Sequence, residues 1–157
     1  KPLRPRVFRQ TLMSLRQGLP TEQRDRHPGA TVSTARRILV VEDEPVNQML
    51  MTMLLKRAGH EVETQEHGSA ALERLRTGVF HLVFMDISMP EMNGIEVTWR
   101  ARKEGCTTPI IICSANAMPE DLAAARSAGA NGFLKKPYSF EELQHMIVRH
   151  APQALTP

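Results

Sequence analysis

Residues 38–44 read Ile-Leu-Val-Val-Glu-Asp-Glu, an unbroken apolar run that ends abruptly in three carboxylates. A second run of this kind, Ile-Ile-Ile-Cys-Ser, occupies residues 110–114. Continuous apolar runs of this length are typical of central parallel strands that are covered on both faces. The stretch Glu61–Gln65 alternates instead, with Val62 between two glutamates. We therefore expect it to be a strand at the edge of the same sheet.

From Arg36 onward, β-rich segments alternate with longer amphipathic segments. This alternation predicts a parallel sheet with covering helices, an α/β fold of five strand–helix repeats. Four glycines stand where helices should end, and two prolines suit a first helical turn: Gly59, Gly78, Gly105, Gly129, Pro45 and Pro119. The expected strands are Ile38–Glu42, Glu61–Gln65, His81–Asp86, Pro109–Ser114 and Gly132–Lys135, and the expected helices are Pro45–Ala58, Ser69–Thr77, Ile95–Lys103, Pro119–Ala128 and Phe140–His150.

The 157 residues are enough for one domain and a flank, and their charge is unevenly placed. Residues 1–37 hold nine Lys or Arg against two acids, whereas residues 38–157 hold eleven against fifteen. The basic leader has one aromatic residue, Phe8, and so lacks a stacking platform for bases. We interpret it as a solvated linker and expect no binding to nucleic acid.

Two further features of the sequence indicate where the protein is located. No apolar run approaches the roughly 20 residues of a membrane-spanning helix, so no direct membrane contact is expected. The two cysteines, Cys106 and Cys113, suggest neither a disulfide framework nor a zinc site. A cytoplasmic location is therefore expected.

Polar side chains follow the expected strands where a parallel sheet places its ligand site, beyond the carboxyl ends. Clustered carboxylates repel one another unless a cation neutralises them, and oxygen-only ligands favour Mg²⁺. A carboxylate left free can act as a nucleophile toward a phosphoryl group, while a lysine and a hydroxyl bind the phosphoryl oxygens. The residues at the strand ends are Glu42, Asp43, Glu44, Asp86, Ser114, Lys135 and Lys136.

Four segments closely resemble the signatures of response-regulator receiver domains. They are Val-Val-Glu-Asp-Glu at 40–44, Phe-Met-Asp-Ile-Ser-Met-Pro-Glu-Met-Asn-Gly at 84–94, Cys-Ser-Ala-Asn-Ala at 113–117 and Phe-Leu-Lys-Lys-Pro at 133–137. One such motif would be weak evidence, but four in order make a specific match from about Arg37 to His150. The resemblance implies a flavodoxin-like, doubly wound five-stranded sheet of order 2-1-3-4-5 with five helices.

The resemblance also implies a role for each matched position. Asp86 would be the phosphorylation site, and Asp43, Asp86 and the backbone carbonyl of Ser88 would hold Mg²⁺, with Glu42 acting through water. The phosphoryl group would be bound by Ser114, Lys136 and the backbone of Ala115. Ser114 and Phe133 would form the switch, and the Lys136–Pro137 bond would be cis. Glu42 departs from the family, which more often has a second Asp there.

The first expected helix carries more apolar residues than one buried stripe needs. Met49, Met51, Thr52 and Leu55 are candidates for a docking surface, since receivers commonly bind histidine phosphotransfer domains through this helix and methionine adapts to varied partners. A deeply packed helix explains the same residues equally well, so both interpretations stay open.

The leader can be aligned with the end of the domain, because Lys1-Pro2 and the amphipathic residues after it match Lys136-Pro137 and theirs. We expect residues 1–16 to be the last helix of a preceding receiver, or else a basic leader. Residues 17–35 would be a linker, 36–151 the receiver and 152–157 a tail. This arrangement resembles that of hybrid sensor histidine kinases. The parent of this chain would then be an inner-membrane sensor kinase with cytoplasmic receivers.

The expected function is a phosphorelay module that takes a phosphoryl group from a histidine kinase transmitter or a histidine phosphotransfer domain. Such a module is not a conventional enzyme beyond self-phosphotransfer and autodephosphorylation, and weak homodimers are left open. One alternative is a free-standing response regulator whose output domain lies outside this chain. Another is a phosphatase resembling the haloacid dehalogenase group, but these place a second Asp where this chain has Ser88.

Overall fold

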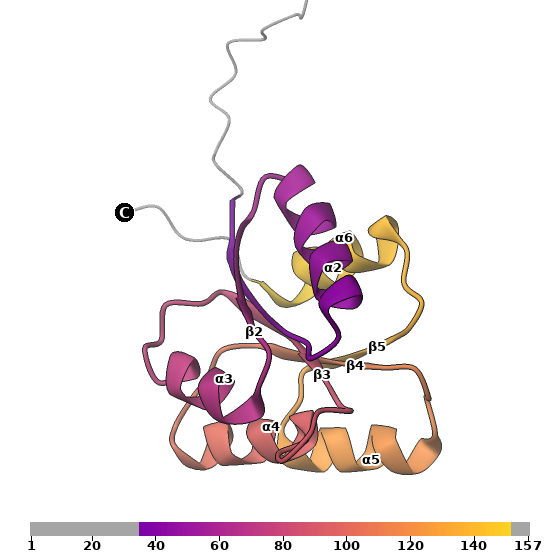
Figure 1. The fold of residues 1–157 in the computed structure, drawn as a ribbon. Helices are drawn as coiled ribbons and strands as arrows, with labels where there is room; N and C mark the ends of the chain where they lie inside the picture. Colours follow the sequence, from indigo (N-terminus) through magenta and orange to yellow (C-terminus); the bar gives the residue numbers. More distant parts are fainter. Residues whose placement is uncertain (1–34, 152–157) are drawn as a thin grey trace, which may run out of the picture. The chain divides into compact units, whose positions relative to one another are not determined.

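The computed structural model describes residues 35–151, which form a five-stranded parallel sheet of order β2-β1-β3-β4-β5 with five helices (Figure 1). The expected helix of residues 1–16, most of the linker and the tail lie outside the described residues. The fold class and strand order are as predicted, and boundaries differ by one or two residues. The elements are β1 Arg37–Val41, α2 Pro45–Arg57, β2 Glu61–Gln65, α3 Gly68–Leu75, β3 Leu82–Asp86, α4 Gly94–Lys103, β4 Ile110–Ser114, α5 Pro119–Ala128, β5 Gly132–Lys135 and α6 Phe140–His150.

The helices cover the sheet in two layers, with α2 and α6 on one face and α3, α4 and α5 on the other (Figure 1). Alternate residues of each central strand enter opposite cores. In β1, Ile38 and Val40 pack toward α2 and α6, whereas Leu39 and Val41 pack toward the other layer. The strands β3 and β4 are buried along their whole length. The continuous apolar runs of the sequence therefore reflect burial on both faces.

The edge position expected for Glu61–Gln65 is confirmed, because among the strands of residues 35–151 β2 pairs with β1 alone. Strand β1 lies beside β3, with Val41 opposite Met85. Strand β3 in turn lies beside β4, with Asp86 opposite Cys113. The residues just after β1, at the end of β3 and at the end of β4 thus meet at one edge of the sheet. The strand order reverses here, because β2 lies on one side of β1 and β3 lies on the other. Ligand sites form at this point in such folds.

Helix α2 corrects one expectation about the docking surface. Met51 and Leu55 are 3% and 1% exposed and belong to the core shared with β1 and α6, so they cannot contact a partner. Met49 is exposed and Thr52 is partly exposed. The spread of apolar residues over the helix concealed which face packs, because both faces carry methionine and leucine. The exposed apolar residues of α2 are Val46, Met49, Leu50 and Met53.

A membrane-spanning helix requires both length and apolar character. Within residues 35–151, none of the helices combines the two.

Candidate acidic site at the strand ends

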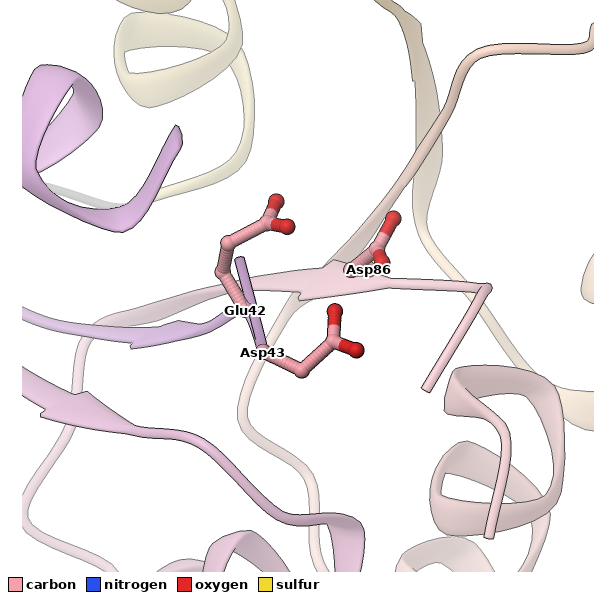
Figure 2. Close-up of side chains that lie close together, drawn as sticks. All are labelled: Glu42, Asp43 and Asp86. Carbon is pink, nitrogen blue, oxygen red and sulfur yellow. The ribbon is translucent and has the colours of Figure 1, made fainter. Parts of the chain in front are cut away.

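Three carboxylates meet beyond the carboxyl ends of β1 and β3 (Figure 2). Asp86 is the last residue of β3, and Glu42 and Asp43 follow β1 directly. One carboxylate oxygen from each residue lies within 4.8 Å of the others. Glu42 and Asp86 are 4% and 5% exposed, whereas Asp43 is half-buried. The predicted convergence of these three side chains is therefore present in the fold.

Lys136 supplies the positive charge of the site. Its Nζ lies 2.6 Å from Oε2 of Glu42 and 2.9 Å from Oδ1 of Asp86. The adjacent Lys135 is exposed, so the choice of Lys136 over Lys135 agrees with the geometry. The Lys136–Pro137 peptide bond is cis, as the family resemblance implied. The lysine therefore bridges the carboxyl ends of three strands, β1, β3 and β5.

The electrostatics of the site follow from burial and crowding. Burial raises the pKa of Asp86, the hydrogen bond from Lys136 opposes this, and the charges of Glu42 and Asp43 raise the pKa further. Burial alone would lower the pKa of Lys136, but its hydrogen bonds to Glu42 and Asp86 outweigh burial, and the net shift is upward. The lysine is thus held as a cation beside carboxylates that gain from neutralisation.

The first turn of α2 orients Glu42. Its Oε1 accepts hydrogen bonds from the backbone N–H of Glu44 at 3.4 Å and from Nδ2 of Asn47 at 3.5 Å. Nε2 of Gln48 donates to the Glu42 carbonyl at 3.0 Å. The sequence did not single out Asn47 and Gln48 as site residues. Their one signal was two amide side chains in the helical turn directly after the acidic run.

Ser114 lies buried at the end of β4, and its hydroxyl is engaged locally. It donates to the carbonyl of Asn116 at 2.8 Å and accepts from the backbone N–H of the same residue at 3.1 Å. Its carbonyl accepts from the backbone N–H of Lys136 at 2.8 Å, which joins the ends of β4 and β5. Ala115 and Ser88 are exposed.

Phe133 is not part of the acidic cluster. It lies opposite Ile112 in the register of β4 and β5, is half-buried, and packs against the core on the side of α3, α4 and α5. Any role for Phe133 in switching would therefore act at a distance from Asp86 and through the intervening strand and loop.

The loop after β3 requires a glycine at position 94. Gly94 is part of the motif of residues 84–94, but the motif did not predict why a glycine is needed there. The backbone N–H of Gly94 donates to the carbonyl of Ile87 at 3.1 Å. A Cβ at position 94 would lie 2.1 Å from the backbone oxygen of Asp86. Only glycine therefore lets α4 begin so close to the end of β3.

The donor set fits a hard divalent cation. Glu42, Asp43 and Asp86 offer oxygen ligands only, and one lysine cannot balance three carboxylates. Mg²⁺ takes one or two carboxylates and keeps several waters, which suits a partly open cluster.

Comparisons with known proteins agree with this geometry. A family model described as the response regulator receiver domain matches residues 38–148. A two-component response regulator of Oryza sativa subsp. japonica is 42% identical over 117 residues, covering 72% of this chain and 92% of the relative. The sensor histidine kinase GacS of Pseudomonas protegens is 32% identical over 160 residues. That alignment covers 99% of this chain but 17% of the kinase.

Solved structures show the same fold. The chemotaxis protein CheY4 of Vibrio cholerae aligns with a TM-score of 0.70 and 30% identity, covering 74% of this chain and 98% of that protein. A sensor histidine kinase receiver domain of Pseudomonas aeruginosa aligns with a TM-score of 0.68 and 33% identity over the same shares, and its structure has a magnesium ion coordinated in the active-site cleft. This chain belongs to the response-regulator receiver domains of two-component signalling.

Proposed function

We propose that Asp86 accepts a phosphoryl group from a phosphohistidine and that this changes the surface the domain offers to partners. The observation that carries the proposal is the position of the Asp86 carboxylate between a bridging lysine and two further carboxylates. An aspartate held beside a fixed cation can approach an anionic phosphoryl group, because the lysine offsets the repulsion between them.

The transfer forms one bond and breaks one bond. An oxygen of the Asp86 carboxylate forms a bond to phosphorus, the bond between phosphorus and the donor's imidazole nitrogen breaks, and that nitrogen keeps the electron pair. The products are an acyl phosphate on Asp86 and a neutral imidazole after protonation. No oxidant or reductant is needed, so the reaction requires only alignment and charge neutralisation.

Three groups are suited to binding the phosphoryl oxygens. The Lys136 ammonium already contacts Asp86. The Ser114 hydroxyl is on the last residue of the neighbouring strand β4, and the backbone N–H of Ala115 follows directly. The Ser114 hydroxyl now donates to Asn116, so it must turn away from that carbonyl to donate to a phosphoryl oxygen. We propose that this rotation and a movement of Phe133 form the switch.

The proposed Mg²⁺ ligands are Asp43, Asp86 and the backbone carbonyl of Ser88. Glu42 would act through water, because its two carboxylate oxygens already accept hydrogen bonds from Lys136, Glu44 and Asn47. A bound divalent cation supplies positive charge to the phosphoryl oxygens during transfer. Asp43 is half-buried and so remains accessible to solvent and to the ion.

We further propose that the domain is a relay station of a hybrid sensor kinase. The support is the GacS alignment, which extends over nearly the whole chain, including the residues before β1. In this arrangement the partners are a kinase transmitter or a histidine phosphotransfer domain. The domain would work on the cytoplasmic side of a membrane-bound parent.

The experiment compares phosphorylation of the wild type with that of Asp86→Asn, using Mg²⁺ and phosphoramidate and measuring the mass of the intact protein. We expect one phosphoryl group on the wild type, loss of labelling in EDTA, and none on Asp86→Asn. Asp121→Asn, at the first turn of α5, is the matched control and should be labelled like the wild type. Equal labelling of the wild type and Asp86→Asn would refute the proposal.

A further inference from the structure

A second cavity lies at the opposite end of the sheet from Asp86. It has a volume of about 280 Å³ and is bounded by the last turns of α5 and α6 and by the start of β5. Asn131 and Gly132 at the amino end of β5 line it, whereas Lys136 follows the carboxyl end of that strand. The cavity is therefore separate from the acidic site.

The charged groups of this cavity are all basic. Arg126 comes from α5, and Arg149 and His150 come from α6; among the described residues, no Asp or Glu lines the cavity. Within residues 35–151, Arg126 and Arg149 make no hydrogen bond or ion pair with the protein, in contrast to Arg74, Arg76 and Arg100, which each pair with a glutamate. Cations suit helix C-termini in general, but that preference does not explain why two free guanidinium groups share one cavity.

The rest of the lining is apolar and partly open. Leu122, Ala125, Phe133 and Met146 contribute carbon surface beside the arginines. Gly132 forms part of the wall, and a Cβ there would lie 3.2 Å from Nε2 of His150 and 2.8 Å from Cδ1 of Ile111. A side chain at position 132 would therefore crowd His150, which also lines the cavity. A ligand that fills this space needs both a charged end and an apolar body.

We propose that this cavity binds a small organic anion, with Arg126 and Arg149 holding its charged oxygens and Phe133 and Met146 contacting its apolar body. Guanidinium groups present paired donors that match carboxylate and phosphonate oxygens. A few polar groups converging on an apolar wall are the usual composition of a small-molecule site. The two sites lie at opposite ends of the sheet, and binding of the anion does not require phosphorylation of Asp86, although Phe133 belongs both to this cavity and to the proposed switch.

The test is a titration with phenylphosphonate followed by ¹H–¹⁵N NMR. This probe has a carbon–phosphorus bond and cannot phosphorylate Asp86. We expect saturable shifts around Asn131, Gly132 and the last turns of α5 and α6, and weaker binding of inorganic phosphate and of benzyl alcohol, which each carry half of the proposed chemistry. The double variant Arg126→Gln/Arg149→Gln should bind at least about tenfold more weakly.

The matched control is Arg57→Gln, which removes an exposed arginine from the last turn of α2 without touching the cavity. It should bind like the wild type, and thermal unfolding by circular dichroism checks that all variants fold. Binding should also raise the pKa of His150, which burial and the charges of Arg149 and His145 lower in the free protein. Non-saturable binding, an equal loss in Arg57→Gln, inorganic phosphate binding as tightly as phenylphosphonate, or an unchanged His150 titration would overturn the proposal.

Discussion

The ammonium group of Lys136 lies 2.9 Å from Oδ1 of Asp86, although fifty residues of sequence separate the two. The same ammonium contacts Glu42, so one cation serves two buried carboxylates. Asp43 makes no hydrogen bond or ion pair with any described residue, and its charge raises the pKa of Asp86. The protein groups of the site therefore carry excess negative charge, which opposes folding and favours a divalent cation.

This excess charge predicts opposite effects of Asp43→Asn on stability and on metal binding. Without metal, the variant should have a free energy of unfolding about 1 kcal/mol higher, because the repulsion from Asp86 and Glu42 is relieved. Its Mg²⁺ affinity should fall at least about tenfold, since a ligand charge is lost. Urea unfolding in EDTA and under increasing Mg²⁺ measures both effects. Glu44→Gln, an exposed neighbour, is the control, and a less stable Asp43→Asn in EDTA would contradict the prediction.

Arg102 carries a second prediction, because its guanidinium joins two loops, the one between α4 and β4 and the one between α5 and β5. It donates to the carbonyls of Gly129, Cys106 and Thr108 at 3.0, 2.8 and 2.9 Å and to Oδ1 of Asn131 at 2.8 Å. A lysine ammonium is a single point charge and cannot reach these acceptors together.

Arg102→Lys should therefore lower the free energy of unfolding by about 2–3 kcal/mol, as expected for lost charge-assisted hydrogen bonds. Arg100→Lys is the matched control, because Arg100 is exposed on the same helix and its one ion pair within residues 35–151 is with Glu96, so its change should stay within about 0.5 kcal/mol. Urea denaturation measures both variants. An equal loss of unfolding free energy in the two variants would show that the four contacts of Arg102 add no more stability than the single ion pair of Arg100.

The sequence predicted the fold because each element carries its own local signal. The apolar runs at 38–41 and 110–113 mark central strands, and glycines mark the helix ends. The strand-end rule of parallel sheets then predicted that Glu42, Asp43 and Asp86 converge with a lysine, and the family resemblance selected Lys136 over Lys135. The strand order itself came from the family resemblance, since local patterns do not say which strands are neighbours.

Contacts that depend on the packing of loops were beyond the sequence. The partners of Arg102 come from loops that meet only in the folded chain, and Gly129 lies 27 residues away from it. Met51 and Met49 have the same chemistry, and only packing decides that one is buried and the other exposed. Periodicity could not separate them, because apolar residues occur on both faces of α2.

A third prediction concerns pH, through a histidine that accepts a backbone hydrogen bond. Nδ1 of His60 accepts from the backbone N–H of Arg36 at 3.2 Å, just before β1. Burial and the charge of Arg36 lower the pKa of His60 from its ordinary value of 6.5. Protonation would remove the acceptor, so the folded state resists protonation more strongly than the unfolded state does.

The contribution of His60 is complete above pH 6.5 and is lost as the pH falls toward its lower folded pKa. In that window the unfolded state binds more protons, so stability should fall by at most about 1.4 kcal/mol per pH unit. His60→Asn keeps an acceptor that does not titrate. Urea unfolding between pH 8 and pH 5 should show a smaller decline for His60→Asn than for the wild type; parallel curves would exclude His60 as the cause.

The last prediction concerns the exposed face of α2, whose residues differ in part from those expected from the sequence. Val46, Met49, Leu50 and Met53 follow the i, i+3, i+4, i+7 spacing of one helical face, and Met49 is 63% exposed. This face begins directly after Glu42 and Asp43, so a partner that delivers a phosphoryl group to Asp86 could bind across it. Such a stripe suits docking against apolar residues of a partner helix.

We therefore expect Met49→Lys/Met53→Lys to reduce phosphotransfer from a phosphorylated histidine phosphotransfer domain at least about tenfold, the size typical of losing anchor residues. Labelling by phosphoramidate should be unchanged, because a small donor does not need the docking face. Val79→Lys is the control, since Val79 is an exposed apolar residue before the amino end of β3. An equal loss with both donors would mean that the substitutions damage the acidic site, and an equal loss in Val79→Lys would mean that added charge alone accounts for the effect. Only a loss confined to the protein donor and to the α2 variant supports docking through this helix.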